Sequence, residues 1–311
     1  MNTMNTQSNA MPGAPFGSPG IAPAAMSSPR PIYWSIRREF WENRYLYIAP
    51  SGVAAVFLFG YLISLIHSPG LVLALQLDSA HHHEDAFGPF DISAALMMGT
   101  AILMSVFYCA EALHGERRDR SILFWKSLPV SDLTTVLAKA SIPLLILPLV
   151  VSAVTAVMQL LMLVLSSAVL LATGGNVAAL WAHVPILQIS LLTLYHLLTA
   201  HALWPAPVYC WLLLVSGWAR RATFLWAALP VVAIGGLEKL AFNTTHFAAL
   251  VGERFIGATA PAASTNVFPS NPMTHITPGA FLASPGLWTG LIVAAIFLAL
   301  AVRLRRYQGP I

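Results

Sequence analysis

The chain has little charge, and this scarcity is the first constraint on its fold. Of its 311 residues, only 9% are Asp, Glu, Lys or Arg, whereas 57% are hydrophobic. Water-soluble domains carry about 25% charged residues, so this composition argues against an ordinary soluble fold. We therefore expect an all-α polytopic membrane protein, whose length is best counted in spans of about 20 apolar residues each.

Cysteines and nucleotide-binding motifs are also scarce. The two cysteines, Cys109 and Cys210, both lie inside apolar runs, which indicates buried thiols rather than a disulfide framework or a zinc site. The sequence contains neither the phosphate-binding loop G-x-x-x-x-G-K-[ST] nor the nucleophile turn G-x-S-x-G. The net charge of +4 gives no reason to expect nucleic acid as a partner. Any use of ATP would therefore require a separate subunit.

Six apolar runs of spanning length follow a polar, proline-rich start. Residues 1–31 carry no charge before Arg30, so we expect a disordered tail ahead of a transmembrane domain over residues 32–311. The six predicted spans are residues 48–66, 92–110, 140–172, 186–218, 223–242 and 285–304. Pro143 and Pro148 are expected to kink the start of the third span. The segment 204–207 (Trp-Pro-Ala-Pro) interrupts the fourth, which we interpret as one broken span; two spans are the alternative.

Residues 33–47 combine aromatic and basic side chains just before the first span. On a helical wheel most of the aromatic residues share one side, and the opposite side carries Ser35, Arg38, Glu39 and Glu42. This pattern favours an interfacial helix that lies along the membrane surface. An ordinary aromatic belt ahead of a span is the alternative.

The distribution of positive charge predicts an orientation. If the N-terminus is cytoplasmic and six spans alternate, every Lys and Arg except Lys239 and Arg254 falls on the cytoplasmic side. This satisfies the positive-inside rule. We therefore predict that both termini are cytoplasmic, and a seventh span would break the pattern.

The longest interval that does not suit a lipid core is residues 111–139, between the second and third spans. It holds a short aromatic and apolar block, in which Ser121 is expected to be the helix N-cap, while Ser131 caps the next helix. The candidate partner-docking residues are Ser121, Ile122, Leu123, Phe124, Trp125, Lys126, Ser127, Leu128 and Pro129. Partner proteins capture such aromatic anchors in pockets, but a helix that rests on lipid would have the same composition.

Ionisable side chains in or near the spans suggest a second kind of site. Glu238, His196 and His201 are candidates for a transport path, because ionisable groups are costly inside a membrane. A polar contact between helices, or pairing of Glu238 with Lys239, is the simpler explanation. Residues 81–85 (His-His-His-Glu-Asp) have the residue types of a metal site, but adjacent loop residues seldom ligate one ion and the HExxH pattern is absent. We predict no catalytic residue, no metal site and no directly bound cofactor.

The run from Glu116 to Asp132, ERRDRSILFWKSLPVSD, and the following Leu137-Ala138-Lys139 resemble the loop between the second and third spans of ABC-2 type transporter permeases. In that family this loop forms a coupling helix that sits in a groove of the ATP-binding subunit. The six-span order, the N-terminal interfacial helix and the apolar loop between the fifth and sixth spans are similar as well. One departure is Arg120, which stands where many members have Gly.

The resemblance implies the membrane subunit of an ATP-driven exporter in the cell inner membrane, not itself an enzyme. The subunit would form a homodimer, or a heterodimer with a similar permease, in contact with lipid. Separate ATP-binding subunits would bind ATP and Mg²⁺. The residues alone leave open a metal-ion permease or an intramembrane enzyme that uses His and carboxylate groups. No motif identifies a substrate.

Overall fold

The computed structural model describes residues 29–67, 83–127, 130–256 and 278–307, and these ranges form helices without any strand. Within them, six helices are long and apolar enough to cross a membrane. They are Tyr45–His67, Gly88–Arg118, Asp132–Ala172, Val177–Leu203, Thr223–Phe242 and Pro285–Tyr307. The expected class, an all-α multi-pass membrane protein, is therefore confirmed. The predicted tail lies outside the described residues up to position 28.

Two helices begin the described chain, α1 (Pro29–Glu42) and α2 (Tyr45–His67), the first predicted span. They are separated at Asn43, whose side-chain amide donates to the carbonyl oxygen of Glu39 at 2.8 Å. The polar side of α1 faces the protein, because Glu39 is buried, while the aromatic side is exposed at Trp34 and Trp41. The first helix is thus amphipathic with its polar stripe turned inwards.

The second span, α4 (His83–Glu111), continues into two short helices, α5 (His114–Arg118) and α6 (Ser121–Ser127). The third span then begins with α7 (Asp132–Ser141). The hydroxyl of Ser131 accepts a hydrogen bond from the backbone N–H of Thr134 at 3.1 Å, so the predicted N-cap of this helix is confirmed.

The third span contains a π-helical turn, η1 (Ile142–Ile146), between α7 and α8 (Leu147–Ala172). The N–H of Leu147 reaches back five residues to the carbonyl of Ile142. Pro143 and Pro148 lie in and just after this turn, and neither can donate a backbone hydrogen bond. A π-turn therefore interrupts the regular α-helix at the two prolines, and the kink expected there stays a prediction.

The fourth predicted span is broken, as its prolines indicated. The structure has α9 (Val177–His183), α10 (Ile186–Leu198), a second π-turn η2 (Thr199–Leu203) and α11 (Ala206–Trp218). The spanning length lies upstream of the break, in Val177–Leu203, whereas α11 is a shorter apolar helix. The two π-turns, η1 and η2, pack against each other, so both spans are irregular at the same level of the bundle.

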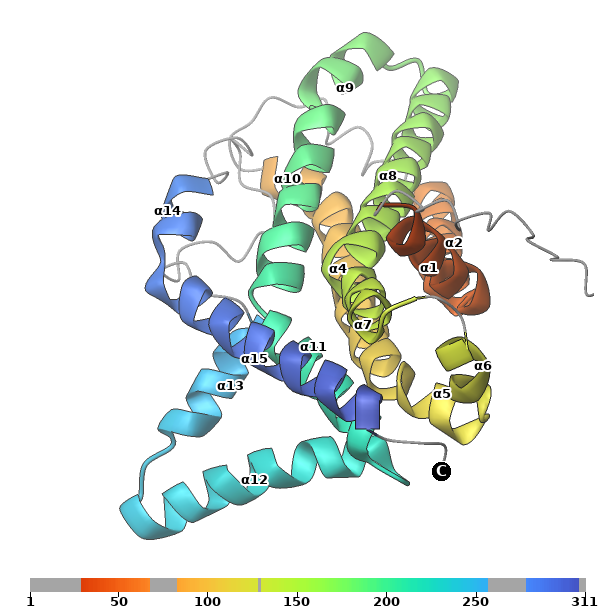
Figure 1. Cartoon of the computed structure of the whole chain (residues 1–311). Coiled ribbons are helices and arrows are strands. Elements are labelled where there is room, and N and C mark those ends of the chain that lie inside the picture. Colours follow the sequence, from red (N-terminus) through yellow and green to blue (C-terminus); the bar gives the residue numbers. More distant parts are fainter. Residues whose placement is uncertain (1–28, 68–82, 128–129, 257–277, 308–311) are drawn as a thin grey trace, which may run out of the picture.

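The last described helices are α12 (Thr223–Phe242), α13 (His246–Ile256), α14 (Pro278–Ala283) and α15 (Pro285–Tyr307). In Figure 1, α8 and α10 stand side by side, α15 crosses α11, and α12 runs away from the bundle. The short helices α5 and α6 lie at the same end of the molecule as the end of α15. This end carries the charged interval singled out above.

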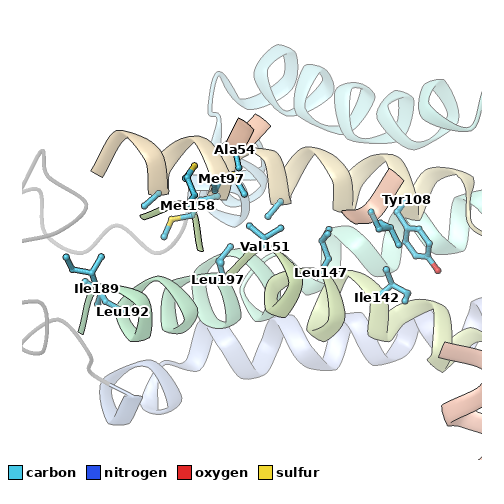
Figure 2. Close-up of a cluster of buried hydrophobic side chains, with 14 of the residues drawn as sticks. Ala54, Met97, Tyr108, Ile142, Leu147, Val151, Met158, Ile189, Leu192 and Leu197 are labelled. Atoms are coloured by element: carbon cyan, nitrogen blue, oxygen red, sulfur yellow. The ribbon is translucent and has the colours of Figure 1, made fainter. Parts of the chain in front are cut away.

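A continuous apolar core joins α2, α4, α8 and α10. Figure 2 shows Met97, Val151, Met158 and Leu197 from three of these helices meeting in its interior. Cys109 and Cys210 are both free and buried, as their apolar surroundings predicted. The core holds the spans together, and the charged residues gather at one end of it.

Candidate functional site

The short helix α6 exposes much of the apolar surface that the sequence predicted for docking. Leu123 and Phe124 are 58% and 60% exposed, while Ile122 is buried and Trp125 lies between these extremes. Leu128 and Pro129 lie outside the described residues. The structure thus presents two large exposed apolar side chains on α6, and it uses Ile122 to fix the helix to the protein.

The turn before α6 differs from the prediction that Ser121 is the N-cap. That prediction is wrong: Ser121 is the first helical residue, and its hydroxyl donates to the carbonyl of Glu116 at 3.4 Å. Arg120 precedes the helix with φ of +58°, in the left-handed region, and its carbonyl accepts from the N–H of Leu123. Glycine adopts this conformation without steric cost, whereas an arginine side chain makes it strained.

Trp125 connects α6 to α1. The guanidinium carbon of Arg38 lies 3.7 Å from the centroid of the Trp125 ring, within the range of a cation–π interaction. The same guanidinium places Nη2 2.7 Å from Oε1 of Glu39. One arginine therefore links the partly buried aromatic ring of the candidate docking helix to a buried carboxylate.

Arg38 belongs to a group of mostly buried charged side chains from four helices, which we call the charge cluster. It consists of Arg38 and Glu39 of α1, Glu116 of α5, Asp132 and Lys139 of α7, and Arg305 of α15. The ammonium of Lys139 lies 2.8 Å from Oε1 of Glu39 and 3.1 Å from Oε1 of Glu116. Lys139 is therefore shared by two carboxylates from helices that are remote in sequence.

Arg305 completes the charge cluster from the end of the sixth span. Its Nη1 contacts Oε2 of Glu116, and its Nε lies 3.2 Å from Oδ1 of Asp132. Glu116 thus contacts cations of both α7 and α15. Because Glu116 lies five residues before Ser121, the start of α6 is held close to the third and sixth spans.

The charge cluster is balanced, with three cationic and three anionic side chains, and most of it is buried. Glu39, Lys139 and Arg305 are 1%, 3% and 6% exposed. Burial acts to raise the pKa of Glu39, but Lys139 and Arg38 outweigh it, so its pKa is lowered. The hydroxyl of Tyr108 also donates to Oε2 of Glu39 at 3.0 Å. Removing one partner from such a group leaves an uncompensated buried charge.

A second set of contacts fixes α5 to the end of α11. Nη1 of Arg117 donates to the carbonyl oxygens of Gly217 and Ala219 at 2.6 and 3.3 Å. Nδ1 of His114 lies 3.2 Å from the same Ala219 oxygen. A cation at the C-terminal end of a helix is favoured by the helix dipole. The segment before α6 is therefore attached to the fourth span as well.

Among the candidates for a transport path, Glu238 lies on a different helix from the two histidines, which are close to each other at the end of α10 and in η2. Glu238 on α12 accepts hydrogen bonds from the Thr244 hydroxyl and from the N–H groups of His246 and Phe247, at 2.7, 2.7 and 2.8 Å. It therefore acts as a cap at the start of α13. His196 lies on α10, with Nδ1 2.9 Å from the carbonyl of Leu192. The structure does not bring Glu238 together with the two histidines.

His201 lies in the π-turn η2, close to the break of the fourth span. Its Nδ1 is buried and makes no hydrogen bond within the described part of the chain. The structure therefore identifies an interior histidine at an irregular turn, and its part in transport stays a prediction.

From the sequence, Arg254 of α13 was predicted only to lie on the non-cytoplasmic side of the membrane, with no structural role. Its guanidinium donates to the carbonyl oxygens of Trp204 and Gly286 at 3.3 and 2.9 Å and lies 4.5 Å from the Trp204 ring centroid. A Cβ atom on Gly290 would stand 2.6 Å from its Nη1. Arg254 thus ties α13 to the break of the fourth span and to the start of α15.

Over the described ranges no group of three or more His, Cys, Asp or Glu side chains is placed to hold a metal ion. His81 and His82 lie outside the described residues, so the five-residue candidate is untested. No protein-family model, curated protein or solved structure matches the chain.

Proposed function

We propose that this chain is the membrane-spanning permease subunit of an ATP-driven ABC-2 type exporter, with α6 as the helix that docks on a separate ATP-binding subunit. The observation that carries the proposal is the exposed apolar surface of α6, at Leu123 and Phe124, on a segment tied by buried ion pairs to two spans. Exposed apolar anchors beside charged groups are typical of protein interfaces.

In this proposal a displacement of α6 is transmitted to the spans through side-chain contacts. Trp125 contacts Arg38, and Glu116, just before α6, contacts Lys139 of α7 and Arg305 of α15. Closure of two ATP-binding subunits on ATP would displace α6 and, with it, the third and sixth spans. Both termini and α6 face the cytoplasm in this proposal, and two permease chains enclose the path in the cell inner membrane. Linkage then requires that substrate binding to the permease alters the affinity of the complex for ATP in return.

Photo-crosslinking tests the docking surface. A benzoylphenylalanine in place of Phe124 should crosslink, in native membranes, to a protein with a P-loop sequence, identified by mass spectrometry. The control is the same replacement at Leu250, which is equally exposed on α13 but faces the other side in this proposal. Equal crosslinking of one protein from both positions, or a Phe124 partner without a P-loop, would contradict the proposal.

Loss of coupling is the functional counterpart. The double variant Phe124→Ala/Trp125→Ala should insert into the membrane normally and lose substrate-stimulated ATPase activity of the complex. An impermeant maleimide should label a Lys126→Cys variant only after the cells are opened; the native Cys109 and Cys210 are buried and give little background. Labelling of Lys126→Cys in intact cells would place α6 on the wrong side and overturn the proposed function.

A further inference from the structure

A cavity of about 370 Å³ opens between α1, α5 and α6, next to the candidate docking surface. Its floor includes Glu39, Glu116 and Lys139 of the charge cluster, and Trp125 of α6 forms one wall. Tyr45, at the start of α2, supplies a second aromatic side chain. The volume falls within the range of small-ligand sites, about 300–1,000 Å³. The cavity is thus large enough for a side chain or a small molecule to enter.

The lining of the cavity is predominantly anionic. Five carboxylates line it, against the two cations Arg118 and Lys139. The two carboxylates of the floor, Glu39 and Glu116, are paired with Lys139, Arg38 and Arg305. The carboxylates at the mouth have fewer cationic partners. There Arg118 contacts both Glu111 and Asp119, at 2.7 and 3.2 Å. The third mouth carboxylate, Glu42, pairs with Arg38 at 3.7 Å, and Arg38 is also paired with Glu39 of the floor. The three mouth carboxylates therefore have two cations, one of which is shared with the floor.

The floor also holds an acceptor without a well-aligned donor. Oε1 of Glu116 is buried and lies 3.1 Å from Nζ of Lys139 and 3.5 Å from Nη2 of Arg38, but no donor in the described ranges makes a hydrogen bond of good geometry to it. Burial also raises the pKa of Glu42, despite Arg38 nearby. A carboxylate that is partly desolvated without a full partner is stabilised by an incoming cation. Aromatic faces next to carboxylates are a combination that receives ammonium or guanidinium groups, and Arg38 already lies over one face of Trp125 in this way.

We propose that this cavity receives a basic side chain, arginine or lysine, from the ATP-binding subunit that docks on α6. The inference rests on the proposed function for the identity of the partner, but not for the chemistry of the cavity. Its position explains the choice of occupant, because Trp125 belongs both to the cavity wall and to α6. A partner helix seated on Leu123 and Phe124 lies within side-chain reach of the mouth. The docked cation would then contact the charge cluster that holds the third and sixth spans.

The test neutralises the mouth and leaves the charge cluster intact. The variant is Glu42→Gln/Asp119→Asn, at two side chains that are 51% and 64% exposed, so the fold should be retained. The control is Glu253→Gln, an exposed carboxylate on α13. The first probe is a fluorescent, blocked Gly-Arg-Gly peptide amide, with Gly-Glu-Gly as its counterpart, titrated onto the purified chain in detergent. The arginine peptide should bind the parent and the control alike, and the mouth variant about tenfold more weakly.

The second arm uses the complex with the ATP-binding subunit. Its dissociation constant should also rise about tenfold in the mouth variant, and the difference should shrink as salt is raised. Arginine-peptide binding that is absent, or equal in the parent and the mouth variant, overturns the cavity assignment even if an ATP-binding subunit crosslinks to Phe124. Absence of any ATP-binding companion overturns the proposed function, and the peptide titration still decides whether the cavity takes a guanidinium group.

Discussion

Arg38 is placed between Trp125 of α6 and Glu39 of α1, with its guanidinium carbon 3.7 Å from the ring centroid and its Nη2 2.7 Å from Oε1 of the carboxylate. Its neighbour Arg37 faces the opposite way, 5.2 and 5.3 Å from the exposed rings of Trp34 and Trp41. Two adjacent arginines on one helix thus have different surroundings, so a substitution of Arg37 is a matched control for the same substitution of Arg38.

We expect Arg38→Gln to loosen α6 without unfolding the spans. Loss of the cation–π contact and of the pair with Glu39 removes the tie between the two helices, because glutamine cannot replace the charge. Hydrogen exchange of the amides in Ser121–Ser127 should accelerate, while exchange in Leu147–Ala172 stays unchanged. Arg37→Gln is the matched control and should leave α6 exchange at the parent rate. If both variants behave alike, Arg38 has no special part in holding α6.

Much of the architecture was predictable, because spans and caps leave local signals. Apolar runs of sufficient length marked the spans, and Ser131 was recognised as a cap from the residues beside it. The proline-rich segment after residue 203 correctly indicated a broken helix. The face that Ser35 and Glu39 share was also visible on a helical wheel. What the wheel cannot tell is which side of the helix meets protein and which meets lipid, and here the polar side meets protein.

The charge cluster was not predictable, for a different reason. Lys139 and Glu39 are 100 positions apart, and Arg305 and Glu116 are 189 apart. No local period connects such pairs. The available signal was weak: Lys139 stands at the head of a long apolar run, where a lone cation needs a partner. The left-handed φ of Arg120 was not predictable either. Glycine is the residue that normally signals this conformation, and the residue at position 120 is arginine.

We expect Lys139→Met to destabilise the protein strongly. Lys139 is 3% exposed and faces two carboxylates, so its removal leaves Glu39 and Glu116 with buried negative charge that Arg38 and Arg305 only partly offset. Breaking a buried ion pair typically costs about 3–5 kcal/mol. The loss should appear as a lower thermal midpoint in detergent. Lys239→Met, an exposed lysine on α12, is the control.

The double variant Lys139→Met/Glu39→Gln provides the complementary measurement. Removing the carboxylate as well eliminates one of the uncompensated charges, so part of the lost stability should return. The interaction free energy follows from the double-mutant cycle. Strict additivity of the two single effects would show that the two side chains do not interact as the 2.8 Å distance implies.

The lowered pKa of Glu39 predicts how stability depends on pH. A carboxyl group with a lower pKa in the folded than in the unfolded state stabilises the fold above the unfolded value of about 4.5. That contribution is lost as the pH falls through the folded pKa. Near Glu39 lie Lys139, Arg38, Glu116 and Tyr108. Between pH 7 and 5 the contribution of Glu39 to the thermal midpoint should be constant.

The variant Glu39→Gln isolates this contribution. It should be less stable than the parent at pH 7. The difference between the two midpoints should narrow below about pH 4.5, where the Glu39 carboxyl of the unfolded chain begins to bind a proton while that of the folded protein is still ionised. Glu253→Gln, at an exposed position, should show no such convergence. A difference that stays constant down to the pH of global unfolding would contradict a stabilising ionised Glu39.

We expect Arg120→Gly to stabilise the turn before α6. Arg120 has φ of +58°, and a left-handed conformation costs about 1–2 kcal/mol for a residue with a Cβ atom. Glycine avoids this cost but loses more chain entropy on folding, by about 0.5–1 kcal/mol, so the net gain should lie between about zero and about 1.5 kcal/mol. The opposite change, Arg120→Val, places a β-branched residue at the same φ and should destabilise the turn.

Hydrogen exchange of the α6 amides measures both effects locally. Arg118→Gly, at the last residue of α5, is the control for the loss of a charge. It removes the ion pairs with Glu111 and Asp119 without relieving a positive φ, so it should not stabilise the turn. If Arg120→Gly also destabilises, the side chain of Arg120 contributes more to α6 than its backbone conformation costs.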